Sequence, residues 1–474
     1  MRNQVVSAAH ERFDSGSLQS ILSTLVACPS ESPVQGAPLR EYLTDTLQPI
    51  LNGLGFTCTV LENPAARHAP FLLAERNESV TAPTVLFYGH GDVIPGQSGQ
   101  WSNGRNPWEL NVAGDRWYGR GTADNKGQHA INLEAISAAI KACDGKIGVN
   151  IKYLFEMGEE IGSPGIHDFC ALHRDRLRAD LFVASDGPRV QANQPTVILG
   201  SRGAFQFKLS LDLRESAHHS GNWGGVLRNP AVVLSHAIAS LIDVHGRISV
   251  DALRPPPVST WIKDALANVA VGGDSNAPDI DHDWGEPGLT SAERLFGWNA
   301  LEVLSMVSGN PEKPVNAVPA TATAVCQLRF VSGTDRDNMQ ARLEQHFRTR
   351  GFEHVKVHVT MNAPATRLDA NDPWVKFVTN SIQITTGMSP ILLPNFGATL
   401  PNDAFADILG LPTIWIPHSY PACSQHAPNE HLLGSVARQA LGMMAGLLFD
   451  IGRQGQEVVL NRAANFMEAS HGGA

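Results

Sequence analysis

The sequence predicts an α/β protein: a mixed, largely parallel sheet flanked by helices, with a smaller α/β unit inserted into it. Near-continuous apolar runs alternate with helical patterns up to about residue 200 and again near the C-terminus, which is typical of strands covered on both faces by helices. In the middle of the chain, runs alternate polar and apolar residues with period two, so one sheet face there should meet water. The length of 474 residues also exceeds one ordinary core. We therefore expect a large unit at residues 1–202 and 383–474 and an inserted unit at residues 203–382.

The large unit should contain short buried strands and long helices. Apolar runs predict strands at TVLFY (84–88), IKYLF (151–155), LFVAS (181–185) and PTIWIP (412–417). Helical spacing of apolar residues predicts helices at residues 126–142 and 432–451. Because parallel strands need helical crossovers, this alternation favours a helix-flanked parallel sheet.

The inserted unit follows a different order of elements. Period-two alternation predicts a strand at residues 205–215, and a helix follows at 229–243. Two more strands are expected at 301–309 and 320–331, then a helix at 335–350 and a strand at 354–361. The order strand, helix, strand, strand, helix, strand is that of a ferredoxin-like sandwich. We therefore expect this unit to form a small α/β lid.

Composition excludes several classes of function. The formal charge is -10, and the sequence has no Lys/Arg block of the kind that follows a phosphate backbone, so nucleic acid is not expected as a partner. No signal peptide or membrane span is predicted, and a cytoplasmic enzyme is expected. The six cysteines are scattered without CxxC spacing, which predicts reduced thiols rather than a zinc ribbon or a disulfide scaffold.

The motif GEEIGS at residues 158–163 places two adjacent glutamates, Glu159 and Glu160, after a strand with a buried pattern. Carboxylates at such a position are costly unless they have a partner. One glutamate could hold a metal ion while its neighbour moves a proton. The pair therefore indicates a metal-dependent active site.

Other possible ligands follow apolar runs or open helices. YGHGDV places His90 and Asp92 two residues apart after a strand, where a carboxylate could bind the far nitrogen of the imidazole and orient it. Asp124 lies in the glycine-rich turn GRGTADNKG, where it could be a metal ligand or a helix N-cap. Asp186 follows LFVAS and could also be an ordinary turn aspartate. His426, in SQHAPNEH, could equally be a surface histidine.

Taken together, these residues supply two imidazoles and three carboxylates, with one further carboxylate beside a ligand. Such a set suits two divalent ions of zinc, cobalt or manganese type, and one carboxylate must bridge them. Two ions could share a water and lower its pKa. The glutamate next to a ligand could then accept the proton of that water and pass it to a leaving nitrogen.

The motifs YGHGDV, YGRGTADNKG, GEEIGS, ASD and HAPNE, in this order, resemble the M20 family of dinuclear zinc aminoacyl hydrolases. HHSGNWGG at residues 218–225 is similar to the carnosine dipeptidase branch. The resemblance implies a zinc-peptidase-like fold and a cis peptide bond between Asp124 and Asn125. It also implies that Asp124 bridges two metals, most often zinc, with His90 and Asp186 at one and Glu160 and His426 at the other. It makes Glu159 the general base and acid, and Asp92 the residue that orients His90.

The resemblance further assigns the lid. His219 resembles the lid histidine that stabilises the oxyanion in the partner subunit's site, which implies a homodimer through the lid. Asn316 and Arg329 match substrate-binding residues, and a bidentate arginine is a natural carboxylate anchor. The turn FGATLPND keeps Gly397 but has Ala398 and Thr399 where the family has glycine and serine.

These residues lead us to expect a metal-dependent dipeptidase that cleaves the amide bond of small peptides with Glu159 as general base and acid. The alternative is an amidohydrolase that removes an acyl group from N-acyl amino acids, because the same centre can serve a different pocket. A non-catalytic scaffold has no need of a complete ligand set beside a proton shuttle. The altered FGAT turn leaves the substrate open between the first two hypotheses.

Overall fold

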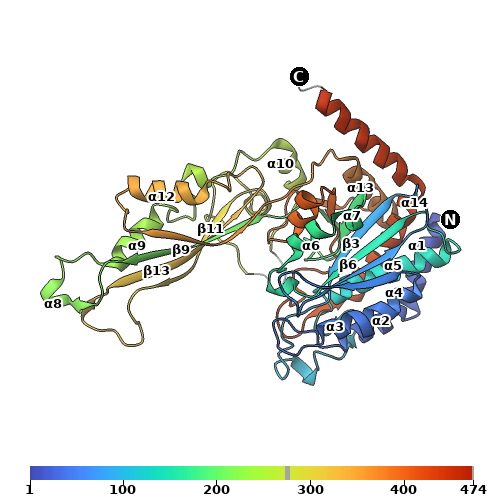
Figure 1. Ribbon diagram of the computed structural model, residues 1–474, viewed down its shortest axis with the longest axis horizontal. Helices are drawn as coiled ribbons and strands as arrows, with labels where there is room; N and C mark the ends of the chain where they lie inside the picture. The colour runs from blue at the N-terminus through green and yellow to red at the C-terminus, as the bar shows by residue number, and fades with distance from the viewer. Residues whose placement is uncertain (273–277, 472–474) are drawn as a thin grey trace.

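The structure is a computed structural model that describes residues 1–272 and 278–471. It contains a large unit and an elongated unit that projects from it (Figure 1). Within the described residues, the large unit holds an eight-stranded sheet. In spatial order its strands are β1 (Thr57–Leu61), β2 (Phe71–Arg76), β6 (Asn150–Glu156), β3 (Thr84–His90), β7 (Leu181–Ala184), β16 (Thr413–Trp415), β8 (Thr196–Ile198) and β15 (Ile391–Leu393).

The central strands of this sheet run parallel. Strand β3 pairs in parallel with both β6 and β7, β16 pairs in parallel with β7, and β15 with β8. Strand β8 pairs antiparallel with β16, so β8 and β15 run opposite to the central strands. The edge formed by β1 and β2 is antiparallel. The predicted mixed, largely parallel sheet is thus confirmed, and the four strands expected from apolar runs all form.

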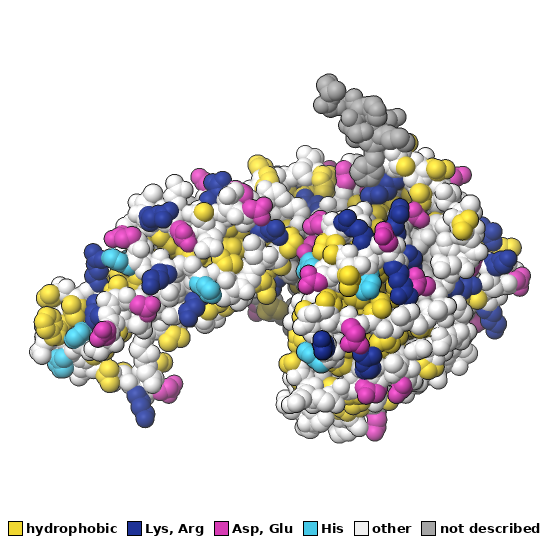
Figure 2. Space-filling view, in the orientation of Figure 1, with side chains coloured by type: hydrophobic (Ala, Val, Ile, Leu, Met, Phe, Trp, Pro, Cys, Tyr) yellow, Lys and Arg dark blue, Asp and Glu magenta, His cyan; other side chains and the backbone are white. Residues whose placement is uncertain are grey.

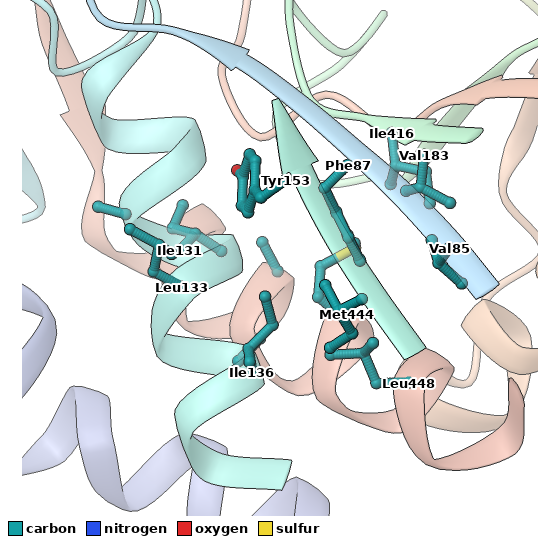
Figure 3. Packing of buried hydrophobic residues seen from close by; sticks show 14 of the residues in the cluster. Val85, Phe87, Ile131, Leu133, Ile136, Tyr153, Val183, Ile416, Met444 and Leu448 are labelled. Carbon is teal, nitrogen blue, oxygen red and sulfur yellow. The ribbon is translucent and has the colours of Figure 1, made fainter. Parts of the chain in front are cut away.

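Helices cover both faces of the sheet because successive residues of each buried strand point to opposite sides. Val85 and Phe87 belong to one core, shared with α1 (Arg2–Asp14), α2 (Ser17–Val26), α5 (Lys126–Ala142), α13 (Pro373–Thr386) and α14 (Gly434–His471) (Figure 3). Leu86 and Tyr88 belong to the other core, with α6 (Ile166–Leu172), α7 (Arg174–Leu177), α10 (Thr260–Leu266) and α11 (Ser291–Phe296). This arrangement leaves the ends of the strands free to carry a site.

Helix α5 has the predicted bounds, but the prediction that the last helix ends at Ile451 is wrong. Helix α14 continues to His471. Gly452 lies inside it, where the helix passes close to the backbone of another segment: a Cβ at this position would lie 2.1 Å from the carbonyl oxygen of Ile147. The glycine therefore permits close packing and does not end the helix.

We use the word lid for the elongated unit built on the four-stranded antiparallel sheet β11-β13-β9-β14. Its elements follow the predicted order: β9 (Gly203–Asp212), α9 (Pro230–Ala239), β11 (Ala300–Val307), β13 (Thr321–Phe330), α12 (Met339–Thr349) and β14 (Lys356–Ala363). Apolar residues of one sheet face pack with α9 and α12 into a separate core. The predicted ferredoxin-like order is therefore present.

Parts of the predicted lid span, residues 203–382, pack on the large unit instead. Ile262 and Leu266 of α10 and Phe296 of α11 are buried in the core of the large unit. Trp374 and Val378 of α13 are buried in its other core, so the expected boundary after residue 382 falls inside a helix that stabilises the large unit. Among the described residues, no helix combines the length and apolarity that a membrane crossing requires.

Candidate metal centre and active site

The candidate ligands gather at the carboxyl ends of three adjacent parallel strands. His90 is the last residue of β3, Glu159 and Glu160 follow β6, and Asp186 follows β7. Because parallel strands end at the same edge of a sheet, the chain brings these side chains together. Asp124 joins them from the turn that precedes α5, through a cis peptide bond to Asn125, as the resemblance implied.

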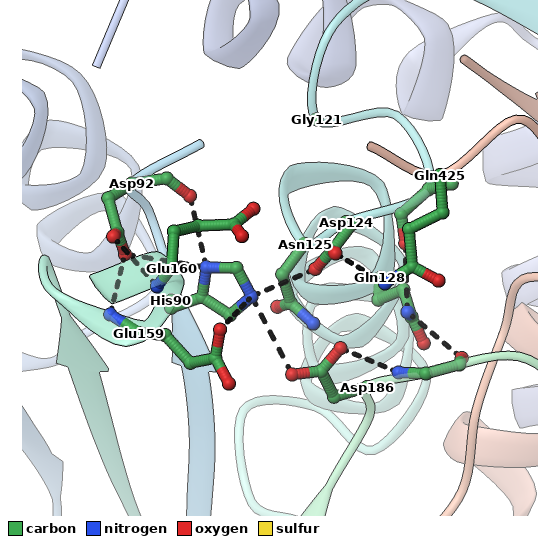
Figure 4. A network of polar contacts seen from close by, with 12 residues as sticks. His90, Asp92, Gly121, Asp124, Asn125, Gln128, Glu159, Glu160, Asp186 and Gln425 are labelled. Atoms are coloured by element: carbon green, nitrogen blue, oxygen red, sulfur yellow. Dashed lines mark hydrogen bonds and ion pairs between the residues drawn. The ribbon is translucent and has the colours of Figure 1, made fainter. Parts of the chain in front are cut away.

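Asp124 lies between two groups of ligand atoms. Its Oδ1 is 3.0 Å from Nε2 of His90, and its Oδ2 is 3.0 Å from Nε2 of His426. On the first side, Oδ2 of Asp186 lies 3.6 Å from Nε2 of His90, and on the second, Oε2 of Glu160 lies 3.0 Å from Nε2 of His426. Figure 4 shows the first group around the imidazole of His90.

This spacing fits metal ions. Donors around a tetrahedral ion with bonds of about 2.0–2.1 Å lie about 3.3 Å from one another, which is close to the 3.0 and 3.6 Å from His90 to its two carboxylates and the 3.0 Å from His426 to each of its own. His90, Asp124 and Glu160 also place one donor atom each within 4.8 Å of one another. We call His90, Asp124 and Asp186, and likewise His426, Asp124 and Glu160, the two candidate three-donor groups, which have the carboxylate of Asp124 in common.

The carboxylates of the cluster lie close together and are buried, so added positive charge would stabilise their ionised forms. Burial and the charge of Asp124 raise the pKa of Glu160 to about 7 and that of Asp186 to about 6. Burial and the charges of Asp186, Asp124 and Glu160 raise the pKa of Glu159 well above its usual value, against the charge of His90. Several carboxylates thus resist ionisation together, a conflict that divalent cations remove.

The two histidines of the cluster also have raised pKa values, which in their case favour the charged form. Burial would lower the pKa of His90, but hydrogen bonds to Asp124 and Asp92 outweigh it and raise the pKa well above the usual value. Hydrogen bonds to Asp124 and Glu160 raise the pKa of His426 to about 10. Without a metal, the imidazoles therefore supply the positive charge that the carboxylates lack.

Asp92 holds both the first histidine and the glutamate pair. Its Oδ1 lies 3.4 Å from Nδ1 of His90, and its backbone oxygen lies 3.0 Å from the same nitrogen. Its two carboxylate oxygens also accept the backbone N–H groups of Glu159 and Glu160, each at 3.2 Å. The side chain of Glu159 is one-fifth exposed, and its Oε2 lies 3.9 Å from Nε2 of His90. Glu159 therefore faces the cluster while remaining accessible.

Sequence reasoning missed Glu430, which organises the turn that carries Asp124. The Glu430 carboxylate accepts the backbone N–H groups of Gly121, Ala123 and Asp124 at 3.0, 2.9 and 3.0 Å. It also pairs with Arg120 at 2.7 Å, and both side chains are 1% exposed. The available signal was an acidic residue inside the motif HAPNE, four positions after His426.

Gln425 was also missed. Its Nε2 donates to Oδ2 of Asp124, the oxygen that faces His426. The loop containing His426 thus supplies both an imidazole and an amide to the same carboxylate. A glutamine in a polar loop gives no sequence signal of such a contact.

Two predicted site residues lie at the remote end of the lid. His219 belongs to β10 (His218–His219), which pairs with β12 (Ala317–Val318), and Asn316 accepts a hydrogen bond from the backbone of Ser220. Helix α8 (Ser220–Trp223), which follows directly, lies at the tip farthest from the large unit in Figure 1. His219 and Asn316 are exposed. Within one chain, neither is brought to the metal cluster.

The other predicted substrate-binding residues meet where the lid joins the large unit. Arg329, near the end of β13, donates from Nη1 to Oγ1 of Thr399 at 2.5 Å. Gly397 accepts a hydrogen bond from Nε of Arg202 at 2.8 Å. The ring of Phe396 lies beside Gly187, which directly follows Asp186: a Cβ on Gly187 would be 2.8 Å from that ring. The FGAT turn therefore borders the metal cluster.

The chain is similar to known hydrolases over most of its length. The cysteinylglycine-S-conjugate dipeptidase of Corynebacterium striatum is 29% identical over 357 residues, which cover 72% of this chain and 75% of that protein. The Beta-Ala-His dipeptidase of Mus musculus is 25% identical over 408 residues, covering 81% of this chain and 80% of that protein. Succinyl-diaminopimelate desuccinylase of Methylobacterium radiotolerans is 24% identical over 382 residues, covering 79% and 83%.

Solved structures share the fold. An M20 family metallo-carboxypeptidase from Sulfolobus solfataricus has a TM-score of 0.76 at 24% identity, over 92% of this chain and 99% of that one. Human carnosine dipeptidase 1 has a TM-score of 0.73 at 22% identity, over 95% and 99%. A model of peptidase family M20/M25/M40 matches residues 86–450, a range that includes the whole metal cluster. The prediction of a metal-dependent hydrolase of this kind is confirmed, and the chain belongs to peptidase family M20/M25/M40.

Proposed function

We propose that this protein is a dipeptidase that hydrolyses the amide bond of dipeptides with two divalent cations, zinc in the first instance, with cobalt or manganese suited to the same donors. His90, Asp186 and one oxygen of Asp124 would hold one ion, and His426, Glu160 and the other oxygen would hold the second. Bound there, the ions would polarise the scissile carbonyl and lower the pKa of a water. The observation that carries this proposal is the position of Asp124, 3.0 Å from each imidazole.

Glu159 is the proton carrier in this proposal. Its side chain faces the cluster without belonging to either three-donor group, and it stays partly open to substrate. The carboxylate can accept the proton of the attacking water and then donate it to the leaving amine. The backbone bonds from Glu159 and Glu160 to Asp92 hold both glutamates in position for their separate tasks.

Arg329 is the proposed anchor for the substrate carboxylate. It is half-buried beside the FGAT turn, and its Nη2 makes no hydrogen bond to any residue that the structure describes. A guanidinium with free N–H groups binds carboxylates in a bidentate manner. Thr399 lies where the family has serine, and its hydroxyl contacts this guanidinium.

We further propose a homodimer in which His219 and Asn316 act in the partner subunit's site. The two residues lie together at the tip of the lid, whereas Arg329 lies near the opposite end of β13, a strand of about 30 Å at about 3.3 Å per residue. One chain cannot bring both ends of this strand to one substrate. A second copy with its lid reversed can supply the missing pair.

The edge of the lid sheet supports this assembly. Strand β11 is an edge strand, and its exposed residues include Leu304, Met306 and Val307 at 53%, 42% and 60%. An apolar groove lined by Ile238, Ile242, Val244, Val303 and Met306 runs between α9 and this strand. Long exposed apolar edges are normally covered in native proteins, so we assign this edge to the dimer contact.

The alternative substrate class is an N-acyl amino acid. Two observations favour keeping it: Ala398 and Thr399 replace the family's glycine and serine, and the chain is similar to a desuccinylase over 79% of its length. The same metal centre would serve either substrate, since fold and centre do not determine the pocket.

A substrate panel tests the proposal. Metal-loaded enzyme, prepared separately with zinc, cobalt and manganese, is incubated with dipeptides and with N-acyl amino acids, and released amino acids are quantified. We expect faster turnover of dipeptides. Glu159→Gln should lower kcat by about 100- to 10,000-fold without lowering metal content. Protein that binds no divalent ion, or full activity of the Glu159→Gln variant, would contradict the mechanism.

A further inference from the structure

Arg202 is a second arginine beside the FGAT turn, more deeply buried than Arg329, and it has no role in the proposed reaction. It precedes β9, its side chain is nearly buried, and it is bonded to the turn on three sides. Its backbone N–H donates to the oxygen of Phe396 at 3.1 Å, and its Nε donates to the oxygen of Gly397 at 2.8 Å. Its own carbonyl oxygen accepts from the hydroxyl of Thr399 at 3.0 Å. Two of these bonds hold the backbone of Arg202 against the turn, and the third holds its guanidinium through Nε.

Arg202 and Arg329 are neighbours. The hydroxyl of Thr399 contacts both residues, because it donates to the backbone carbonyl of Arg202 and accepts from Nη1 of Arg329. The strand register agrees, since Arg329 is paired with Ala204. Burial, followed by the charge of Arg329, lowers the pKa of Arg202 to about 10. The guanidinium of Arg329 and the backbone carbonyl of Arg202 thus meet at one threonine, and the charge of the first guanidinium acts on the second.

No carboxylate of the described chain forms an ion pair with either arginine. Glu302 on β11 acts on Arg202 through its charge but makes no ion-pair contact with it. Nε is the only side-chain nitrogen of Arg202 that donates to a described residue. Buried charges are costly unless they are paired. The remaining N–H groups are accordingly available to an anion from outside the chain.

The two arginines lie against a turn that is close to the metal cluster, so an anion that they bind can be part of the substrate. The turn that holds both arginines borders Gly187, next to Asp186 of the metal cluster. Figure 2 shows an open hollow between the lid and the large unit, below the place where the two units join. An anion bound by the pair would therefore lie beside the turn that contacts Gly187, one residue after Asp186.

We propose that Arg202 and Arg329 form a subsite for two carboxylates, so that the preferred dipeptides end in aspartate or glutamate. This inference rests on the proposed function. Arg329 binds the α-carboxylate and Arg202 binds the side-chain carboxylate of the same residue. A single carboxylate can neutralise one guanidinium, whereas two fixed guanidiniums with free N–H groups complement a dianion.

The test compares acids with their amides, which have nearly the same shape. For the wild-type enzyme, kcat/KM for Ala-Glu and Ala-Asp should exceed that for Ala-Gln and Ala-Asn by about 10- to 100-fold, as expected for a hydrogen bond to a charged group. Arg202→Met should remove this preference by lowering only the values for the acids. Arg367→Met changes another partly buried arginine, which donates to Asn395, and should leave the preference intact.

Binding provides a readout independent of turnover. Calorimetry with metal-loaded protein should show free glutamate and aspartate binding at least about tenfold more tightly than glutamine and asparagine, and Arg202→Met should abolish the difference. Equal treatment of acids and amides by the wild type overturns the subsite, even if Arg202→Met fails to fold. So does an equal loss for acids and amides in that variant. Dipeptides that are cleaved without preference refute the subsite alone, whereas Arg202-dependent binding without any cleavage refutes only the proposed function.

Discussion

Replacing Glu430 by glutamine should weaken both the fold and the metal centre. In the native protein, one carboxylate oxygen of Glu430 accepts from Ala123 and Asp124, and the other accepts from Gly121 and Arg120. Glutamine has nearly the same size but only one acceptor oxygen. If that oxygen retains the first two bonds, the amide NH2 group must face two donors, and Arg120 loses its buried partner.

The magnitude follows from these contacts. Removal of one partner from a buried ion pair costs about 3–5 kcal/mol, and each lost hydrogen bond to a charged group costs about 1.5–3 kcal/mol. These costs overlap because the Arg120 contact is counted in both. We therefore expect the free energy of unfolding to fall by about 3–5 kcal/mol. Since Asp124 is held by the same carboxylate, we also expect metal affinity to fall by about 10- to 100-fold.

Two measurements separate the effects. Urea unfolding of metal-free protein reports stability, and competition with a chromophoric chelator reports metal affinity. The control is Asp450→Asn, which removes the carboxylate that pairs with Arg2 at 2.9 Å and joins α14 to α1. This control should lower stability without changing metal affinity. If Glu430→Gln left metal affinity unchanged, or destabilised the protein by less than about 1 kcal/mol, the role assigned to Glu430 would be refuted.

Three further predictions concern the dimer and the pH dependence of stability. His219→Ala and Glu159→Gln homodimers should both be nearly inactive. Mixing and reassociating them should restore activity, because each heterodimer then contains one intact site. If no activity were recovered, His219 would belong to its own subunit's site. Met306→Lys on β11 should convert the dimer to monomer, as measured by sedimentation velocity. The control is Met361→Lys, a residue that is 45% exposed on the opposite edge strand β14, and it should leave the dimer intact. A dimer that survives Met306→Lys would contradict the assigned contact. Burial raises the pKa of Glu156 to about 7 in the folded protein, from an ordinary value of 4.5, so the folded state is destabilised as pH rises from the lower to the higher of these values. In metal-free protein, the free energy of unfolding of Glu156→Gln should therefore rise relative to that of wild type by up to about 3 kcal/mol between pH 4.5 and pH 8. A difference in urea unfolding that does not change with pH would argue against this prediction.

Much of the site was predictable because its residues occur in short motifs at strand ends. His90, the glutamate pair and Asp186 each follow an apolar run, and parallel strands bring such positions to one edge. The residues themselves did not predict which of Glu159 and Glu160 binds metal and which carries the proton, because both side chains have the same chemistry. The family resemblance proposed an order, and the structure places Oε2 of Glu160 3.0 Å from His426.

Contacts between segments distant in sequence were not predictable. Glu430 binds a turn about 300 residues earlier, with sequence separations of 306 to 309 for its backbone contacts. The pairing of Arg202 with the FGAT turn likewise spans a separation of 195. No local pattern records such distances, because hydrogen-bond partners of this kind are selected by packing and not by periodicity.

By itself the sequence determined the fold class, the order of elements in the lid and the identity of the residues that could bind metal, because periodicity and motif spacing are local properties of the chain. Only the tertiary structure decided that Asp124 lies between two imidazoles, that Arg202 and Arg329 share one threonine, and that His219 and Asn316 lie far from the cluster in their own chain. Each of these facts depends on the relative placement of separate strands and units. That placement comes from the burial of apolar faces over the whole chain, which no single motif contains.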